Sequence, residues 1–129
     1  MSDKVMIVDD ALFMRAMLRK TLSAAEGLEI LEAPDGPTAV RLYQSERPGL
    51  VLLDISMPGM SGIDVLRQIR AIDRLARVVM CSAIGQDSMM MEAISGGAVD
   101  FIVKPFKPEQ ILRAVQAAFP HRQGKEGNP

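Results

Sequence analysis

The stretch that decides the fold lies in the middle of the chain, where residues 50–62 read LVLLDISMPGMSG. Four consecutive apolar residues without polar alternation are typical of a strand that is buried on both faces. The run ends at Asp54, and Pro58, Gly59 and Gly62 then indicate a loop. Strands buried on both faces occur where helices cover the two sides of a parallel sheet.

The same alternation of short apolar runs and helical patterns repeats along the whole chain. We predict five strand-then-helix units, with strands over 5–8, 28–33, 50–53, 78–81 and 99–103 and helices over 11–25, 37–44, 63–72, 85–95 and 108–119. Because crossovers between parallel strands are right-handed, helices reach both faces only if the strand order reverses. The predicted fold is therefore an α/β, three-layer, doubly wound (βα)5 sandwich with a five-stranded parallel sheet.

Length and composition set limits on the protein class. The 129 residues predict one domain over 1–120, followed by a polar, frayed tail over 121–129. A formal net charge of −1 and 4% aromatic residues argue against a nucleic-acid-binding surface. The single cysteine, Cys81, cannot form an intrachain disulfide, and we expect it in the core. No apolar run is long enough to span a bilayer, so we expect a cytoplasmic protein without membrane contact.

Polar residues stand where the predicted strands end. Asp9 and Asp10 follow the first strand, Asp54 the third, Ser82 the fourth and Lys104 the fifth. The carboxyl ends of parallel strands share one edge of the sheet, which is where such folds bind ligands. Three carboxylates there repel one another, and Mg²⁺ with one lysine balances their charge. The order of elements therefore predicts a Mg²⁺ site at this edge.

The chemistry that suits these groups is phosphoryl transfer. It depends mainly on positioning and on neutralising the phosphoryl oxygens, and a carboxylate can itself be the nucleophile. The only histidine, His121, lies in the tail, so serine- or cysteine-protease chemistry has no base near this edge. A simpler role remains for Asp10, which is also well placed to cap the following helix.

Four segments together resemble the receiver domain of bacterial two-component response regulators. They are residues 9–10, 53–62, 82–83 and 101–106, and the likeness extends from residue 4 to about 119. Residues 9–15, 85–86 and 92–106 are most similar to the stand-alone chemotaxis regulators of that family (CheY-like). The resemblance implies the flavodoxin-like strand order 2-1-3-4-5.

The resemblance also implies a role for each residue at this edge. Asp54 would be the phosphoacceptor. Asp10, Asp54 and the backbone carbonyl of Ser56 would bind Mg²⁺ directly, and Asp9 would bind it through water.

Three further residues would take part in the switch. Ser82 and Lys104 would contact the phosphoryl oxygens, and a cis peptide bond is implied between Lys104 and Pro105. Phe101 matches the aromatic residue whose rotamer follows Ser82. Ser82 stands where threonine is commoner, and Phe101 lacks the phenol hydroxyl of many chemotaxis members.

The function implied is that of a signalling switch rather than an enzyme. A histidine kinase would donate the phosphoryl group, with self-catalysed transfer and slow autodephosphorylation. An output protein, such as a flagellar motor switch component, would bind the face of the fourth helix, fifth strand and fifth helix. Three consecutive methionines at 89–91 span about 200° of that helix, so at least one should be exposed. We expect a monomer.

Other functions remain open at this point. The chain could be a phosphorelay intermediate or the receiver fragment of a longer regulator. An aspartyl-phosphate phosphatase of the haloacid dehalogenase type is a weaker alternative, because Ser56 stands where its second acid would be. An FMN carrier is weaker still, because Asp9 and Asp10 would repel a phosphate.

Overall fold

Five parallel strands form one sheet at the centre of the computed structural model, which describes residues 3–122. The strands are β1 (Asp3–Val8), β2 (Leu28–Ala33), β3 (Leu50–Asp54), β4 (Val78–Ser82) and β5 (Asp100–Val103). They lie in the order β2-β1-β3-β4-β5, and every neighbouring pair is parallel. The predicted sandwich and its strand order are confirmed.

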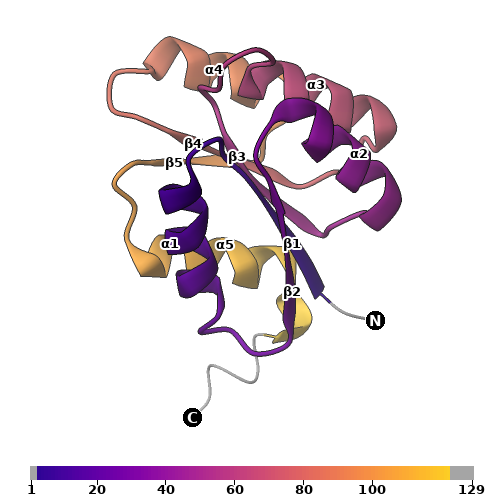
Figure 1. The fold of residues 1–129 in the computed structure, drawn as a ribbon, viewed down its shortest axis with the longest axis vertical. Coiled ribbons are helices and arrows are strands. Elements are labelled where there is room, and N and C mark those ends of the chain that lie inside the picture. Colours follow the sequence, from indigo (N-terminus) through magenta and orange to yellow (C-terminus); the bar gives the residue numbers. More distant parts are fainter. Residues whose placement is uncertain (1–2, 123–129) are drawn as a thin grey trace.

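Helices cover both faces of this sheet. They are α1 (Leu12–Leu22), α2 (Gly36–Glu46), α3 (Gly62–Ile72), α4 (Asp87–Ser95) and α5 (Pro108–Ala118). Figure 1 shows α1 and α5 on one face and α2, α3 and α4 on the other. The chain steps from β1 to one edge at β2 and then turns back across the sheet, so right-handed crossovers place α2, α3 and α4 on the face opposite α1.

Alternate residues of each strand supply the two cores. Val5 and Ile7 of β1 pack with α1 and α5, whereas Met6 and Val8 pack in the cluster that α2, α3 and α4 cover. All five residues of β3 and all five of β4 are buried. This is why these strands read as continuous apolar runs. Cys81 of β4 is buried in the first of these cores, as predicted.

Two helices are shorter than predicted by two residues or more. We predicted a helix from residue 11 to 25, but α1 ends at Leu22 and continues as a tight turn whose bonds run from Ala24 N–H to Thr21 and from Ala25 N–H to Leu22. The fourth helix begins at Asp87 rather than at Gly85. Gly85 has a φ of +96°, which a right-handed helix does not allow.

Ordered structure continues beyond the expected end of the domain. Residues Pro120–Arg122 form a 3₁₀ turn, although we expected fraying from residue 121. Arg122 is buried, donates from Nη1 to Asp3 Oδ2 at 3.0 Å and also bonds to the Glu26 carbonyl. His121 Nε2 lies 2.9 Å from the same Asp3 oxygen. The rest of the predicted tail, 123–129, lies outside the described residues.

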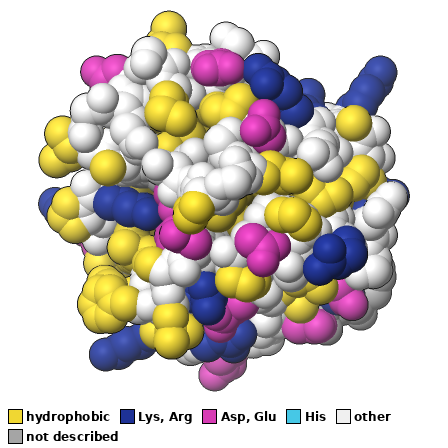
Figure 2. Space-filling view, turned by 45° about the horizontal axis from the view of Figure 1, so that its top comes forward, with side chains coloured by type: hydrophobic (Ala, Val, Ile, Leu, Met, Phe, Trp, Pro, Cys, Tyr) yellow, Lys and Arg dark blue, Asp and Glu magenta, His cyan; other side chains and the backbone are white. Residues whose placement is uncertain are grey.

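The surface is mixed in charge. Figure 2 shows apolar, basic and acidic side chains interspersed on the face turned to the viewer, so this face offers no continuous basic field for a phosphate backbone. Across residues 3–122, no helix is both long and apolar enough to cross a membrane.

The loop after β3 approaches the start of α3 so closely that it needs a glycine. Gly62 donates its N–H to the Ile55 carbonyl at 3.0 Å. A Cβ atom at position 62 would lie 2.7 Å from the Cα of Ile55 and closer still to the Asp54 carbonyl oxygen. Both neighbours are backbone atoms that cannot move aside without displacing the end of β3. The absence of a side chain at position 62 therefore allows α3 to begin directly against the backbone that carries Asp54.

We predict that Gly62→Ala lowers the free energy of unfolding by roughly 1–3 kcal/mol, because overpacked backbone must shift. Gly96→Ala is the matched control, since Gly96 has a right-handed φ of −82° and its Cβ would find ordinary contacts from 3.4 Å outward. Urea denaturation of the two variants measures the difference. Equal unfolding midpoints for Gly62→Ala and Gly96→Ala would contradict the close-packing argument.

Candidate functional site

Three carboxylates meet where β1 and β3 end side by side. Val8 pairs with Leu53 in the sheet register, so the next residues, Asp9 and Asp54, emerge next to each other. Asp10 follows at the start of the loop. One oxygen from each of the three carboxylates lies within 4.8 Å of the others. Asp9 and Asp54 are buried, whereas Asp10 is exposed.

Lys104 reaches these carboxylates from the far side of β4. It follows β5 directly, and its Nζ lies 3.2 Å from Asp9 Oδ2 and 3.3 Å from Asp54 Oδ1. Its own N–H donates to the Ser82 carbonyl at 2.7 Å, which fixes the backbone at the end of β5. The Lys104–Pro105 peptide bond is cis, as expected.

Burial and neighbouring charges shift the pKa values of Asp54 and Lys104. Burial raises the pKa of the Asp54 carboxyl, and the nearby charge of Asp9 raises it further, while Lys104 and the Ser56 N–H only partly offset them. Burial acts to lower the pKa of Lys104, but the carboxylates of Asp54 and Asp9 outweigh it, so the pKa is raised. Lys104 therefore stays charged and is the local partner of two acids.

The donor set fits a hard divalent cation. Lys104 pairs with Asp9 and Asp54, and among the described residues no basic side chain lies within ion-pair distance of Asp10. Three carboxylates against one lysine leave two negative charges at the edge of the sheet. Carboxylate oxygens are the ligands that Mg²⁺ prefers, and a group of two or three acids with access to water suits it. These residues could hold Mg²⁺.

Backbone N–H groups orient two of the acids. Asp9 Oδ1 accepts from the Ala11 N–H at 2.9 Å, and Asp54 Oδ1 accepts from the Ser56 N–H at 3.2 Å.

The alternative role for Asp10 as a helix cap is wrong. The N-cap residue of α1 is Ala11, and no side chain caps the helix. Asp10 is thus left exposed beside the other two carboxylates.

Ser82 lies at the same edge but points elsewhere. It is fully buried, and its hydroxyl donates to the Sδ of Met90 on α4 at 3.0 Å. This partner could not be predicted from the sequence, because a methionine in a helix usually signals only core packing. The expectation of an exposed methionine in 89–91 is confirmed, since Met91 is 71% exposed.

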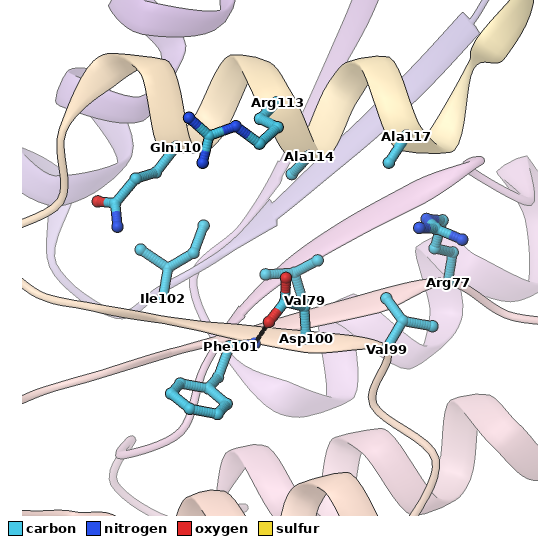
Figure 3. A pocket seen from close by; sticks show the side chains of 10 residues that line it. All are labelled: Arg77, Val79, Val99, Asp100, Phe101, Ile102, Gln110, Arg113, Ala114 and Ala117. Atoms are coloured by element: carbon cyan, nitrogen blue, oxygen red, sulfur yellow. Dashed lines mark hydrogen bonds between the residues drawn. The ribbon is translucent and has the colours of Figure 1, made fainter.

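Phe101 borders a shallow hollow of about 250 Å³ between β5 and α5. Figure 3 shows its ring on the side of β5 away from α5, and the side chain is 40% exposed. In the same view Arg77 stands at one end of the hollow, and Arg113 extends from α5 between Gln110 and Ala114. The Arg77 Nε is buried, and no hydrogen-bond partner for it lies among the described residues. Because its side chain is partly exposed, Phe101 lies at the surface in this structure.

Comparison with known families identifies the class. Residues 5–116 match the response regulator receiver domain, and the chain belongs to that family. Receiver domains are signalling proteins, which implies a kinase and an output partner. The resemblance inferred from the sequence is confirmed.

Individual relatives place the chain within the family. It is 48% identical to the chemotaxis protein CheY of Bacillus subtilis over 116 residues, which cover 89% of this chain and 96% of that protein. It is also 37% identical to the sporulation initiation phosphotransferase F of Bacillus subtilis over 120 residues, or 93% of this chain and 96% of that protein. The crystallised chemotaxis protein CheY4 of Vibrio cholerae superposes with a TM-score of 0.83 at 30% identity, covering 92% of this chain and all of that one. The chain is thus CheY-like.

We predict that Asp54→Asn raises the free energy of unfolding at pH 7 without Mg²⁺ by about 1 kcal/mol, because it removes a buried, repelled charge and leaves Lys104 paired with Asp9. Because the pKa of Asp54 is raised on folding, the cost of carrying its charge in the folded state begins as pH rises past the ordinary value of 3.8. This cost is complete above the folded-state pKa. The gain should therefore vanish below pH 3.8.

Urea denaturation in EDTA at both pH values tests this. Glu29→Gln, which removes an exposed carboxylate from β2, is the control and should change stability little. A loss of stability in Asp54→Asn at pH 7 would show that the Lys104 contact outweighs burial.

Proposed function

We propose that this chain accepts a phosphoryl group from a histidine kinase on Asp54 and then switches a protein-binding face, in control of chemotaxis and the flagellar motor. The observation that carries the proposal is the position of Lys104, whose Nζ lies within 3.3 Å of both buried acids. The similarity to chemotaxis proteins CheY supports the pathway.

In the proposed transfer, an Asp54 oxygen attacks the phosphorus of a phosphohistidine. A P–O bond forms, the P–N bond breaks, and its electron pair returns to the imidazole of the donor. Asp54 Oδ1 already accepts from Ser56 N–H and Lys104, whereas no hydrogen bond to Oδ2 occurs among the described residues. Oδ2 is therefore the oxygen that we assign as the nucleophile.

Asp9, Asp10, Asp54 and the backbone carbonyl of Ser56 would hold Mg²⁺. The ion supplies neutralisation of phosphoryl oxygens when it is bound. Lys104 would exchange one of its carboxylate contacts for a phosphoryl oxygen, and the Ser82 hydroxyl would donate to another.

The phosphorylated state would be transient. The acyl phosphate would be lost by slow autodephosphorylation, so the chain would act as a timed switch rather than as an enzyme with turnover. We further propose that the 1–120 domain works as a monomer in the cytoplasm.

We place the output face on α4, β5 and α5. Met91, Ile94, Val99 and Phe101 expose apolar surface there. Arg77 and Arg113 border the hollow beside them, so the face suits a partner that carries both apolar and acidic side chains. Burial of the Phe101 ring after Ser82 moves would reshape this face.

A second candidate function is that of a phosphorelay intermediate. The similarity to sporulation initiation phosphotransferase F over nearly the whole chain favours it. In that role the phosphoryl group on Asp54 would pass to a histidine of a phosphotransfer protein instead of acting through the output face.

Intact-mass measurement after incubation with acetyl phosphate tests the phosphoacceptor. We expect one phosphoryl group on the wild type with Mg²⁺, and none with EDTA or on Asp54→Ala. Asp64→Ala, which removes an exposed acid of α3, should be labelled like the wild type. Equal labelling of Asp54→Ala would rule out Asp54. The labelled protein also separates the two functions, because a relay would lose its phosphoryl group rapidly to a histidine phosphotransfer protein.

Amide chemical shifts test the output face. With beryllofluoride and Mg²⁺ as the phosphoryl mimic, we expect changes at Met91 and Ile94 of α4 and at Phe101 of β5. Amides on the exposed side of α2, such as those of Arg41 and Gln44, should stay constant. Changes confined to the loops around Asp54 would contradict a switch of the α4–β5–α5 face.

A further inference from the structure

The hydroxyl of Ser82 is committed to an acceptor that the proposed phosphoryl chemistry does not use. Ser82 Oγ donates to Met90 Sδ at 3.0 Å, and both side chains are buried, with Met90 only 8% exposed. Among the contacts of the described residues, the hydroxyl reaches neither Asp54 nor Lys104. A donor placed to serve a phosphoryl group on Asp54 is thus turned toward α4.

We propose that Met90 is a positioning residue, whose thioether sulfur holds the Ser82 hydroxyl in its resting orientation and competes for it with a phosphoryl oxygen on Asp54. This inference rests on the proposed role of Asp54 as the phosphoacceptor. Exchange of the acceptor carries the state of Asp54 directly to α4.

The two acceptors differ in strength, which sets the direction of the exchange. A thioether sulfur is a weak, uncharged acceptor, whereas a hydrogen bond to a charged phosphoryl oxygen is roughly twice as strong as a neutral one. The hydroxyl therefore moves to the phosphoryl group once it is present. Without that group, the sulfur satisfies a buried donor that would otherwise be left unpaired. Met90 stabilises the resting state and makes the exchange depend on phosphorylation.

The position of Met90 explains why α4 would respond. This helix has nine residues, of which only Met90 and Ala93 are buried. The side chain of its N-cap residue, Gln86, does not cap the helix and instead accepts from the Ala83 N–H at 2.7 Å. Loss of the Ser82 contact removes a hydrogen bond that joins the first turns of α4 to the end of β4. Met91 is exposed on the same helix, within the proposed output face.

Met90→Leu tests the sulfur, because leucine keeps the apolar volume and removes the acceptor. Met89→Leu is the matched control, since the Met89 sulfur lies 3.9 Å from Gln86 Nε2 and makes no contact with Ser82 among the described residues. The probe is beryllofluoride with Mg²⁺. Loss of one neutral hydrogen bond from the resting state should tighten beryllofluoride binding by Met90→Leu roughly two- to tenfold. Met89→Leu should bind like the wild type.

A double-mutant cycle separates positioning from packing. In a Ser82→Ala background there is no hydroxyl to hold, so adding Met90→Leu should leave beryllofluoride affinity unchanged. In a Ser82→Thr background, which keeps a hydroxyl, Met90→Leu should again tighten binding.

A second measurement does not depend on the folding of Met90→Leu. With ¹³C-methyl methionine, the Met90 methyl resonance should move in Ser82→Ala, and move likewise when beryllofluoride and Mg²⁺ are added to the wild type, whereas that of Met89 should stay.

The outcomes distinguish the two proposals. Failure of the wild type to bind beryllofluoride with Mg²⁺ would contradict the proposed function itself. A wild type that binds, with Met90→Leu indistinguishable from Met89→Leu and a Met90 methyl resonance that does not move, would overturn the role of Met90 alone. So would an equal effect of Met90→Leu with and without the Ser82 hydroxyl.

Discussion

The contact of one lysine with two buried acids is the interaction on which the site depends. Asp9 and Asp54 lie side by side at the ends of neighbouring strands, and burial together with the charge of Asp9 raises the pKa of the Asp54 carboxyl. The charge of Lys104 partly offsets this effect, and Lys104 follows β5, two strands away from β3 in the sheet. For the contact to form, β5 must pair with β4, and its carboxyl end must lie level with those of β1 and β3. The strand order, the register and the apolar central strands all serve to bring these three charges to one edge. A change in strand order or register would therefore also separate Lys104 from the two acids.

Rigid and weakly attached elements lie on the two sides of this edge. Every residue of β3 and β4 is buried, so the residues at their ends have little freedom. By contrast, α4 buries only Met90 and Ala93. Elements with few buried contacts open at low free-energy cost, and switching segments are drawn from them. Helices α1 and α5 also bury two residues each, so under the proposed function it is the hydrogen bond from Ser82 to Met90 that would direct a change of charge at the rigid edge to α4.

Much of this could be predicted from the sequence, because apolar runs and the residues that end them are local signals. The strands, the layers and the meeting of Asp9, Asp10, Asp54 and Lys104 follow from chain order and parallel pairing. What could not be predicted depends on contacts without a local signal. The bond from Arg122 to Asp3 joins residues 119 positions apart. The positive φ of Gly85, which delays the start of α4, is allowed by glycine but not specified by it. The sulfur of Met90 looks like ordinary core in sequence.

The alternation of β1 and β3 residues between two separate cores has a consequence for how this chain can vary. A one-residue insertion within β3 would advance the following residues by about 3.3 Å and turn each of them to the opposite face. Leu52 and Leu53 would exchange cores, and the Asp54 carboxylate would leave the neighbourhood of Asp9. Helix surfaces and the loops at the opposite edge of the sheet carry no such restriction. Single insertions or deletions in the strands that precede the acids should therefore be far more damaging than substitutions, because they reverse the face of every residue that follows in the strand.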